Sequence, residues 1–254
     1  MNDSLSPTQE FYSLLEKAYD VFNNRLFEGQ LTNCLLTVQR EKKTMGYFSR
    51  NRWVNTKGDI KHEIALNPSY FARHKVIEIF QTLVHEQCHL WQFEFGNASR
   101  PTYHNKEWAE KMESIGLMPT NTGLPGGRKT GQKMGDYAIP GGEFLNVSKE
   151  LINNGISITW FDRITAKTPA TQSREGLQSN TKTQSMEQST EHLLYSYVSE
   201  LIPNKDDIEE PMFQIAAKNI SKIKYSCRSC SANVWGKPQL SVICGNCNQP
   251  FEVD

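Results

Sequence analysis

The chain has 254 residues, which is enough for one sizeable domain and one small module. Its 28 Lys and Arg residues balance its 28 Asp and Glu residues, so overall charge gives no argument for nucleic-acid binding, and any such surface must be local. The N-terminal residues lack the basic start and apolar stretch of a secretory signal, and no run reaches the roughly 20 apolar residues of a membrane span. We therefore expect a cytoplasmic protein without membrane contact.

Apolar spacing predicts a small set of helices and strands in the first 165 residues. In chain order, these are a helix over 8–28, strands over 34–39, 45–50 and 63–67, a largely apolar helix over 74–95, a helix over 106–116, a Gly- and Pro-rich loop or lid over 119–142, a helix over 146–153, and a strand over 156–161. Together they predict an α+β fold in which helices accompany a small antiparallel or mixed sheet.

The composition changes after residue 165. Residues 166–190 are rich in Thr, Ser, Gln and Lys and contain almost no apolar residues, which predicts a flexible linker. Apolar residues at helical spacing then predict one more helix near 193–201, and a cysteine-rich module ends the chain. We therefore expect a domain over 1–165, a linker over 166–190, and a helix plus small module over 191–254.

The helix over 74–95 contains two histidines one turn apart. His85 and His89 lie four residues apart, so they share a helix face with Cβ atoms about 5–6 Å apart and can bind one metal ion together. Glu86 is offset around the helix, beside the metal, where it can accept a proton from a metal-bound water. This is the arrangement of His-Glu-x-x-His zinc peptidases. The alternative is a chance match with both histidines on a solvated face.

A catalytic zinc usually has three protein ligands and one open position. His104 is the expected third ligand, because it follows His89 by fifteen residues in a loop that can fold back over the metal. Glu107 and Glu110 are the alternatives, since some related enzymes take a glutamate from the following helix.

The strand that precedes the metal-binding helix is the predicted binding site for a peptide substrate. Peptidases of this architecture often pair a sheet-edge strand with the substrate backbone. This assigns substrate contacts to three residues of that strand: Ile64, Ala65 and Leu66. A nearby aromatic cluster lines the cleft or, equally, belongs to the core: Tyr47, Phe48 and Trp53.

Four of the six cysteines form two Cys-x-x-Cys pairs near the C-terminus: Cys227, Cys230, Cys244 and Cys247. Thirteen residues separate the pairs, a spacing at which four thiolates can hold one tetrahedral zinc. Such a site has no open position, so this zinc is predicted to be structural and the zinc at the histidines catalytic. Disulfides or free thiols are the alternatives.

The cysteine module is locally basic, which makes it the candidate surface for nucleic acid. An exposed aromatic ring in such a surface can stack on unpaired bases. The predicted contact residues are Lys222, Lys224, Arg228, Trp235 and Lys237. The alternative is an ordinary solvated surface whose aromatic residues belong to the core.

Residues 8–118 and 222–251 together resemble the SprT-like family, which includes the Spartan proteases. The resemblance rests on the segments 24–31, 46–48, 64–67, 82–89 and 104–108, and on the cysteine pairs that follow in the expected order. It implies a compact zincin-like domain followed by a zinc ribbon, and it supports His104 over the two glutamates. It also implies that proteins crosslinked to DNA are possible substrates. Asn105 departs from the Gly often found after the third histidine, which is expected to weaken the local turn.

The leading hypothesis is a DNA-associated zinc endopeptidase in which Glu86 is the general base, with a protein substrate and with DNA bound by the ribbon. In a bacterium it would be nucleoid-associated. One alternative is a nucleic-acid-binding zinc adaptor whose zincin domain is not catalytic, against which the intact His85, Glu86 and His89 argue. The other is an intracellular peptidase that acts on a specific regulator without DNA.

Overall fold

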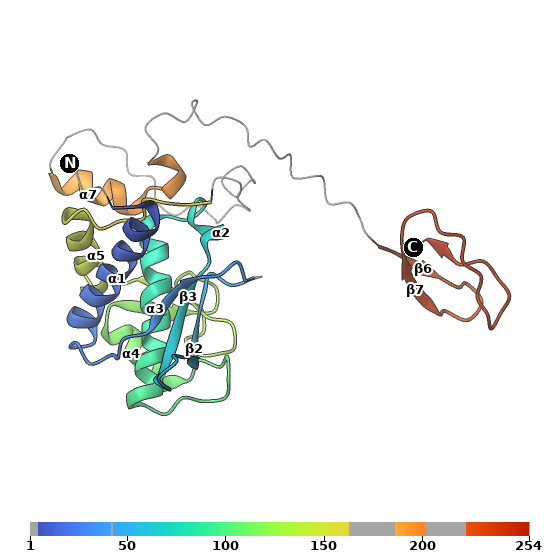
Figure 1. Ribbon diagram of the computed structural model, residues 1–254, viewed down its shortest axis with the longest axis horizontal. Helices are drawn as coiled ribbons and strands as arrows, with labels where there is room; N and C mark the ends of the chain where they lie inside the picture. The colour runs from blue at the N-terminus through green and yellow to red at the C-terminus, as the bar shows by residue number, and fades with distance from the viewer. Residues whose placement is uncertain (1–4, 42, 163–185, 202–221, 254) are drawn as a thin grey trace. The chain divides into compact units, whose positions relative to one another are not determined.

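The computed structural model describes residues 5–41, 43–162, 186–201 and 222–253 (Figure 1). The chain divides into two compact units, Met1–Lys205 and Asp206–Asp254. The first unit mixes helices with small sheets, and the second contains a three-stranded sheet. The predicted α+β class is therefore confirmed. Among the described residues, every helix falls short of the length and apolar character needed to cross a membrane.

The elements of both units follow in chain order. The first unit contains α1 (Pro7–Leu26), β1 (Leu35–Val38), β2 (Gly46–Val54), β3 (Ile60–Leu66), α2 (Pro68–Phe71), α3 (Val76–Phe95), α4 (Lys106–Ser114), β4 (Leu117–Thr120), β5 (Gly135–Ala138), α5 (Glu143–Asn153), α7 (Met186–Tyr195) and the short 3-10 helix η1 (Val198–Glu200). The second unit contains β6 (Ile223–Ser226), β7 (Asn233–Gly236) and β8 (Glu252–Val253).

Helix α3 is the element around which the first unit packs. It is buried along most of its length, and in Figure 1 it runs with α1 and α5 on one side and β2 and β3 on the other. The ring of Phe22 on α1 lies 5.6 Å from that of Phe80 on α3 and 5.7 Å from that of Phe144 on α5. These aromatic contacts pack α1 against both α3 and α5. The buried helix predicted from the sequence is thus confirmed.

Strand β3 lies at the centre of its sheet, parallel to β1 on one side and antiparallel to β2 on the other. The predicted substrate contacts at Ile64, Ala65 and Leu66 are therefore wrong. Both edges of β3 are occupied by neighbouring strands, and these three side chains are almost completely buried. The edge strands of this sheet are β1 and β2, and β2 is the one that contacts α3 more extensively.

Two predicted segments differ from the structure. The predicted loop over 119–142 contains the end of β4 and all of β5, which pair antiparallel from Leu117 with Ala138 to Thr120 with Gly135. The strand predicted over 156–161 is absent. This apolar segment follows α5 and packs on the core without pairing with another strand. Its apolar content therefore reflects burial and not sheet formation.

Helix α7 and the residues that follow it pack with the first unit, whereas the sequence predicted that 191–254 form a helix plus small module. Leu194 and Val198 are buried in the core of the first unit. The carbonyl of Ser196 accepts a hydrogen bond from the N–H of Val76, 3.2 Å away, at the start of α3. Most of the predicted linker lies outside the described residues, and its last five residues, 186–190, belong to α7.

Gly46 sets the distance between β2 and α3. A Cβ atom at this position would lie 2.8 Å from Cγ2 of Thr82 and 2.9 Å from the carbonyl oxygen of Ala65. We expect Gly46→Ala to lower the free energy of unfolding by about 1–3 kcal/mol, as overpacking does, measured by thermal or urea unfolding. Gly135→Ala is the matched control, because its nearest neighbours are 3.7 Å away. Equal stability of the two variants would contradict the tight contact.

Candidate functional site

Three histidines of the first unit converge on one point. His85 and His89 project from α3, and His104 precedes α4. The Nε2 atom of His104 lies 3.2 Å from Nε2 of His85 and 3.1 Å from Nε2 of His89. Tetrahedral nitrogen ligands of one zinc ion, at 2.0–2.1 Å from the metal, lie about 3.3 Å apart. The three side chains therefore have the spacing of ligands to one metal ion.

Hydrogen bonds at the opposite ring nitrogens determine the tautomers of two of these histidines. Nδ1 of His85 lies 3.0 Å from the Asp136 carboxylate, and Nδ1 of His104 lies 3.1 Å from the carbonyl oxygen of Gly131. Because an ionised carboxylate and a carbonyl can only accept, each Nδ1 carries a proton, and in the neutral imidazole Nε2 keeps its lone pair. Two lone pairs that face each other repel, so this arrangement fits a cation.

Burial favours the neutral form of two of the imidazoles. It lowers the pKa of His89 well below its usual value and that of His104 to about 4, and in both the charge of His85 adds to the effect. In His85, burial also acts to lower the pKa, but the hydrogen bond to Asp136 and the charge of Glu86 outweigh it and the pKa is raised. Neutral imidazoles offer the lone pairs that a metal requires.

Glu86 lies beside the three histidines and is 6% exposed. Burial raises its pKa to about 7, against the opposing effects of His85 and of a hydrogen bond from the backbone N–H of Phe48 on β2. A carboxyl group with a pKa near neutrality can both accept and return a proton in this range. Its position and its pKa both suit the predicted general base.

The two alternative third ligands face other partners. The Glu107 carboxylate accepts hydrogen bonds from Nε2 of Gln92 at 2.8 Å and from the N–H of Asn97 at 2.7 Å. Glu110 is exposed and forms an ion pair with Lys106 at 3.3 Å. Neither glutamate belongs to the group of converging ligand atoms, which consists of the three histidines.

Asn105 stabilises the turn after His104, which corrects the expectation that it weakens it. Asn105 is the N-cap of α4, and its side chain accepts a hydrogen bond from the N–H of Trp108 at 3.0 Å. The completely buried Trp108 ring in turn contacts all three imidazoles, with ring centroids 4.4 to 5.4 Å apart. The start of α4 therefore both places His104 and packs against the ligand set.

The histidines line a cleft of about 1470 Å³, which exceeds the roughly 300–1,000 Å³ of ordinary small-molecule pockets. Seven polar residues of α3 line it: Glu78, Gln81, Thr82, His85, Glu86, His89 and Gln92. Residues 46–50 of β2 also line it, so Tyr47 and Phe48 are cleft residues, whereas Trp53 is exposed outside it. The cleft therefore has the volume to hold a polypeptide segment.

Two residues of the site were not predicted from the sequence. Asp136 on β5 and Gly131 in the loop before it orient His85 and His104, and the Asp136 carboxylate also accepts a hydrogen bond from Nε2 of Gln81 at 2.9 Å. Both lie in the segment expected to be a loop or lid. In the sequence, Asp136 is a single acidic residue in a Gly-rich stretch. Neither a helical nor a strand spacing relates it to the histidines.

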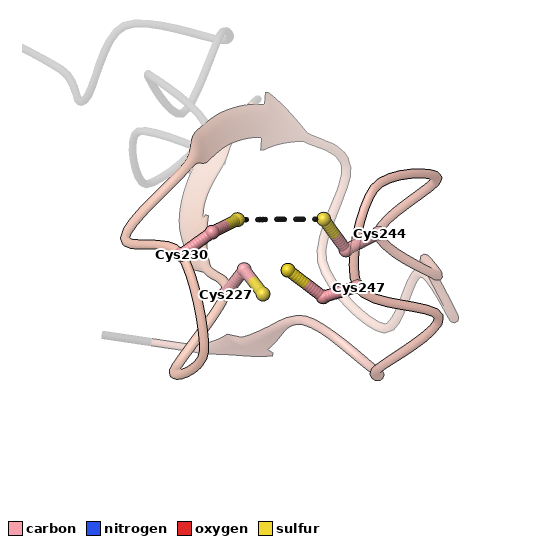
Figure 2. A group of neighbouring side chains, drawn as sticks. All are labelled: Cys227, Cys230, Cys244 and Cys247. Atoms are coloured by element: carbon pink, nitrogen blue, oxygen red, sulfur yellow. Dashed lines mark hydrogen bonds between the residues drawn. The ribbon is translucent and has the colours of Figure 1, made fainter.

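The four C-terminal cysteines point toward one another in the second unit (Figure 2). Their sulfur atoms all lie within 4.8 Å of each other, and those of Cys230 and Cys244 are 3.6 Å apart. Tetrahedral zinc–thiolate bonds of 2.3 Å place sulfurs about 3.8 Å apart. The cysteines form no disulfides. Backbone N–H groups of Cys247 and Asn246 lower the pKa of Cys244 to about 7, which favours the thiolate that a metal needs.

The residues predicted to bind nucleic acid are distributed unevenly on the second unit. Lys224 on β6 lies opposite Trp235 on β7, so their side chains share one face of the sheet, and Trp235 is 62% exposed. Lys222 and Lys237 lie one residue beyond the ends of β6 and β7, two positions from Lys224 and Trp235 respectively. Arg228 forms an ion pair with Glu252 at 2.8 Å, so its charge is already partnered.

Comparisons with known proteins show what part of the first unit is similar to. Residues 15–128 match the model of the SprT-like family. An uncharacterized protein in the mucB 3' region of Salmonella typhimurium is 54% identical over 48 residues, which are 19% of this chain and 65% of that protein. No solved structure matches the chain. The SprT-like family predicted from the sequence motifs is therefore the family whose model matches residues 15–128.

Asp136 provides a test of the histidine site. We expect Asp136→Ala to weaken Zn²⁺ binding at the histidines about 10- to 100-fold, because His85 loses the acceptor that fixes its tautomer. A chelator titration measures this, with the four-cysteine site as an internal reference whose affinity stays constant. Asp20→Ala, at an exposed position of α1, is the control. Unchanged affinity in Asp136→Ala would show that the hydrogen bond does not support the ligand set.

Proposed function

We propose that this protein is a zinc-dependent endopeptidase whose first unit has a zincin-like fold. The observation that best supports this is the convergence of three imidazole Nε2 atoms beside a buried glutamate in a polypeptide-sized cleft. The match of residues 15–128 to the model of the SprT-like family, a family of metallopeptidases, supports the same activity. The histidine spacing also matches the His-Glu-x-x-His motif of such enzymes.

In this proposal, His85, His89 and His104 hold the zinc, and Asp136 and Gly131 orient two of them. A zinc ion bound there supplies Lewis acidity to the scissile carbonyl and lowers the pKa of water. The Glu86 carboxylate accepts the proton of the attacking water and then donates it to the nitrogen of the leaving amine. The N–H of Phe48 holds this carboxylate toward the cleft.

Strand β2, in place of β3, is the proposed binding strand for the substrate backbone. The N–H of Phe48 points away from β3 toward Glu86. By the two-residue period of a strand, the N–H of Gly46 points the same way, and Arg50 follows where the pairing of β2 with β3 becomes irregular. All three residues line the cleft. An extended peptide that adds to this edge passes directly beside the histidines, as in other cases of strand addition.

The second unit is proposed to hold a structural zinc through its four cysteines and to bind DNA through the face that carries Trp235. The exposed ring has a lysine beside it on the same face, which is the combination used by surfaces that bind single strands. A tether of this kind would direct the peptidase to proteins bound or crosslinked to DNA. A structural zinc explains why a module this small is folded at all.

Substitution of Glu86 tests the peptidase. We expect wild-type protein to cleave an unfolded protein substrate, faster with single-stranded DNA, and Glu86→Gln to reduce cleavage at least about 100-fold, because the general base is removed. The assay is substrate loss on a gel, together with zinc counted per chain.

Two zinc ions per chain are expected in wild type and in Glu86→Gln alike. Glu110→Gln, at an exposed position of α4, is the control and should cleave normally. Cleavage retained by Glu86→Gln would contradict the mechanism. DNA binding without cleavage of any substrate would instead favour a nucleic-acid-binding adaptor with a non-catalytic first unit, and cleavage without DNA binding would favour a peptidase for a specific regulator.

Trp235 tests the DNA-binding face. We expect Trp235→Ala to weaken binding of a labelled single-stranded oligonucleotide by about 1–3 kcal/mol, the contribution of one base stacked on an aromatic ring. Fluorescence anisotropy measures the affinity. Trp160→Ala is the matched control, because Trp160 is 46% exposed but belongs to the first unit. If both substitutions have the same effect, the proposed face does not bind DNA.

A further inference from the structure

Four basic side chains line the cleft of the first unit, and each comes from a different segment. They are Lys43 before β2, Arg50 on β2, Arg100 between α3 and α4, and Lys133 before β5. We refer to these four residues as the cleft cations. All four are exposed, and within the described part of the chain none of them forms an ion pair.

Aromatic rings hold two of the cleft cations in place. The guanidinium of Arg50 lies 6.0 Å from the centroid of the Phe93 ring, and that of Arg100 lies 5.1 Å from the centroid of the Tyr103 ring. Such contacts leave the charge available to a ligand while reducing the freedom of the side chain. The positive charge is therefore partly preorganised around the cleft.

The acidic residues of the cleft already have other partners. The Glu78 carboxylate lies 3.0 Å from Nδ1 of His74 and accepts a hydrogen bond from the N–H of Lys75 at 2.8 Å. The Asp136 carboxylate contacts His85 and Gln81, and Glu86 is buried beside the histidines. These carboxylates therefore do not neutralise the cleft cations, and a ligand in the cleft meets an excess of positive charge.

The outer edge of β2, apart from the Phe48 N–H that bonds Glu86 and the Gly46 carbonyl that accepts from Oγ1 of Thr44, determines the kind of ligand that these charges receive. Unpaired N–H and C=O groups along a strand edge pair with another polypeptide backbone, which a nucleic acid does not have. We propose that the cleft selects acidic polypeptide segments, with their backbone along β2 and their carboxylates on the cleft cations. This inference rests on the proposed function, because it names the substrate class of the same cleft.

The selectivity follows from the energetics of exposed ion pairs. Each such pair changes affinity about 1.5- to 5-fold, so two pairs give about 2- to 25-fold in favour of an acidic segment over a neutral one, and further pairs give more. Exposed charges are screened over about 8 Å at 0.15 M salt and over about 3 Å at 1 M. The preference must therefore decrease as salt is added.

Binding of matched peptides to the zinc-loaded, full-length Glu86→Gln protein tests the proposal. Two fluorescent peptides share a length and an apolar centre, and carry either Glu or Lys at the flanking positions. We expect the acidic peptide to bind at least about tenfold more tightly at low salt, with most of the difference lost near 1 M salt. In Arg50→Glu/Lys133→Glu the preference should disappear or reverse. Lys17→Glu/Lys106→Glu, at exposed sites outside the cleft, should retain it.

Three outcomes would overturn the proposal. The first is equal binding of the two peptides. The second is an acidic preference that persists in Arg50→Glu/Lys133→Glu. The third is a loss of affinity for a single-stranded oligonucleotide in that variant, with its affinity for the acidic peptide unchanged. The last outcome would assign the cleft cations to nucleic acid. Because binding is measured without turnover, an acidic preference in a protein that cleaves nothing would refute the peptidase and leave this inference intact.

Discussion

The histidine site depends on three imidazole Nε2 atoms being held at one point. Acceptors opposite His85 and His104 keep a proton on each Nδ1, so in the neutral imidazoles the Nε2 lone pairs face each other across 3.2 Å. Burial disfavours relief of the repulsion between lone pairs by protonation of His89 and His104, because it lowers their pKa values. A metal cation removes the repulsion and satisfies all three nitrogens together. The ligand set therefore makes physical sense as a metal site.

The remaining elements of the first unit hold the two sides of this site against α3. On one side, Gly46 lets β2 approach closely enough for the Phe48 amide to reach Glu86. On the other side, the β4–β5 hairpin brings Asp136 and Gly131 to the histidines. The cleft is the space between these two sides. The same packing that orients the metal ligands therefore also leaves the edge of β2 open to a polypeptide.

The parts of the site that the sequence predicts are those encoded by short spacing. Four residues in a helix place His85 beside His89, and two residues between cysteines place the thiolates of each pair together, whatever the rest of the chain does. The order of strands in the sheet is not encoded in this way, so β3 was mistaken for an edge although its own residues were correctly assigned to a strand. Asp136 is likewise found through the tertiary fold, because 51 residues separate it from His85.

The structural unit that completes the histidine site extends beyond the segment that matches the family. That match ends at residue 128, whereas Gly131 and Asp136 follow it, and the Ser196 carbonyl that receives the first N–H of α3 lies farther still. A chain cut at the end of the match would keep all three histidines and Glu86 but lose the acceptors that orient two of the ligands. Each candidate metal centre nevertheless takes all its ligands from one unit. Metal binding by the cysteines therefore has no ligand in common with the chemistry at the histidines, and the second unit can act as a separate binding module.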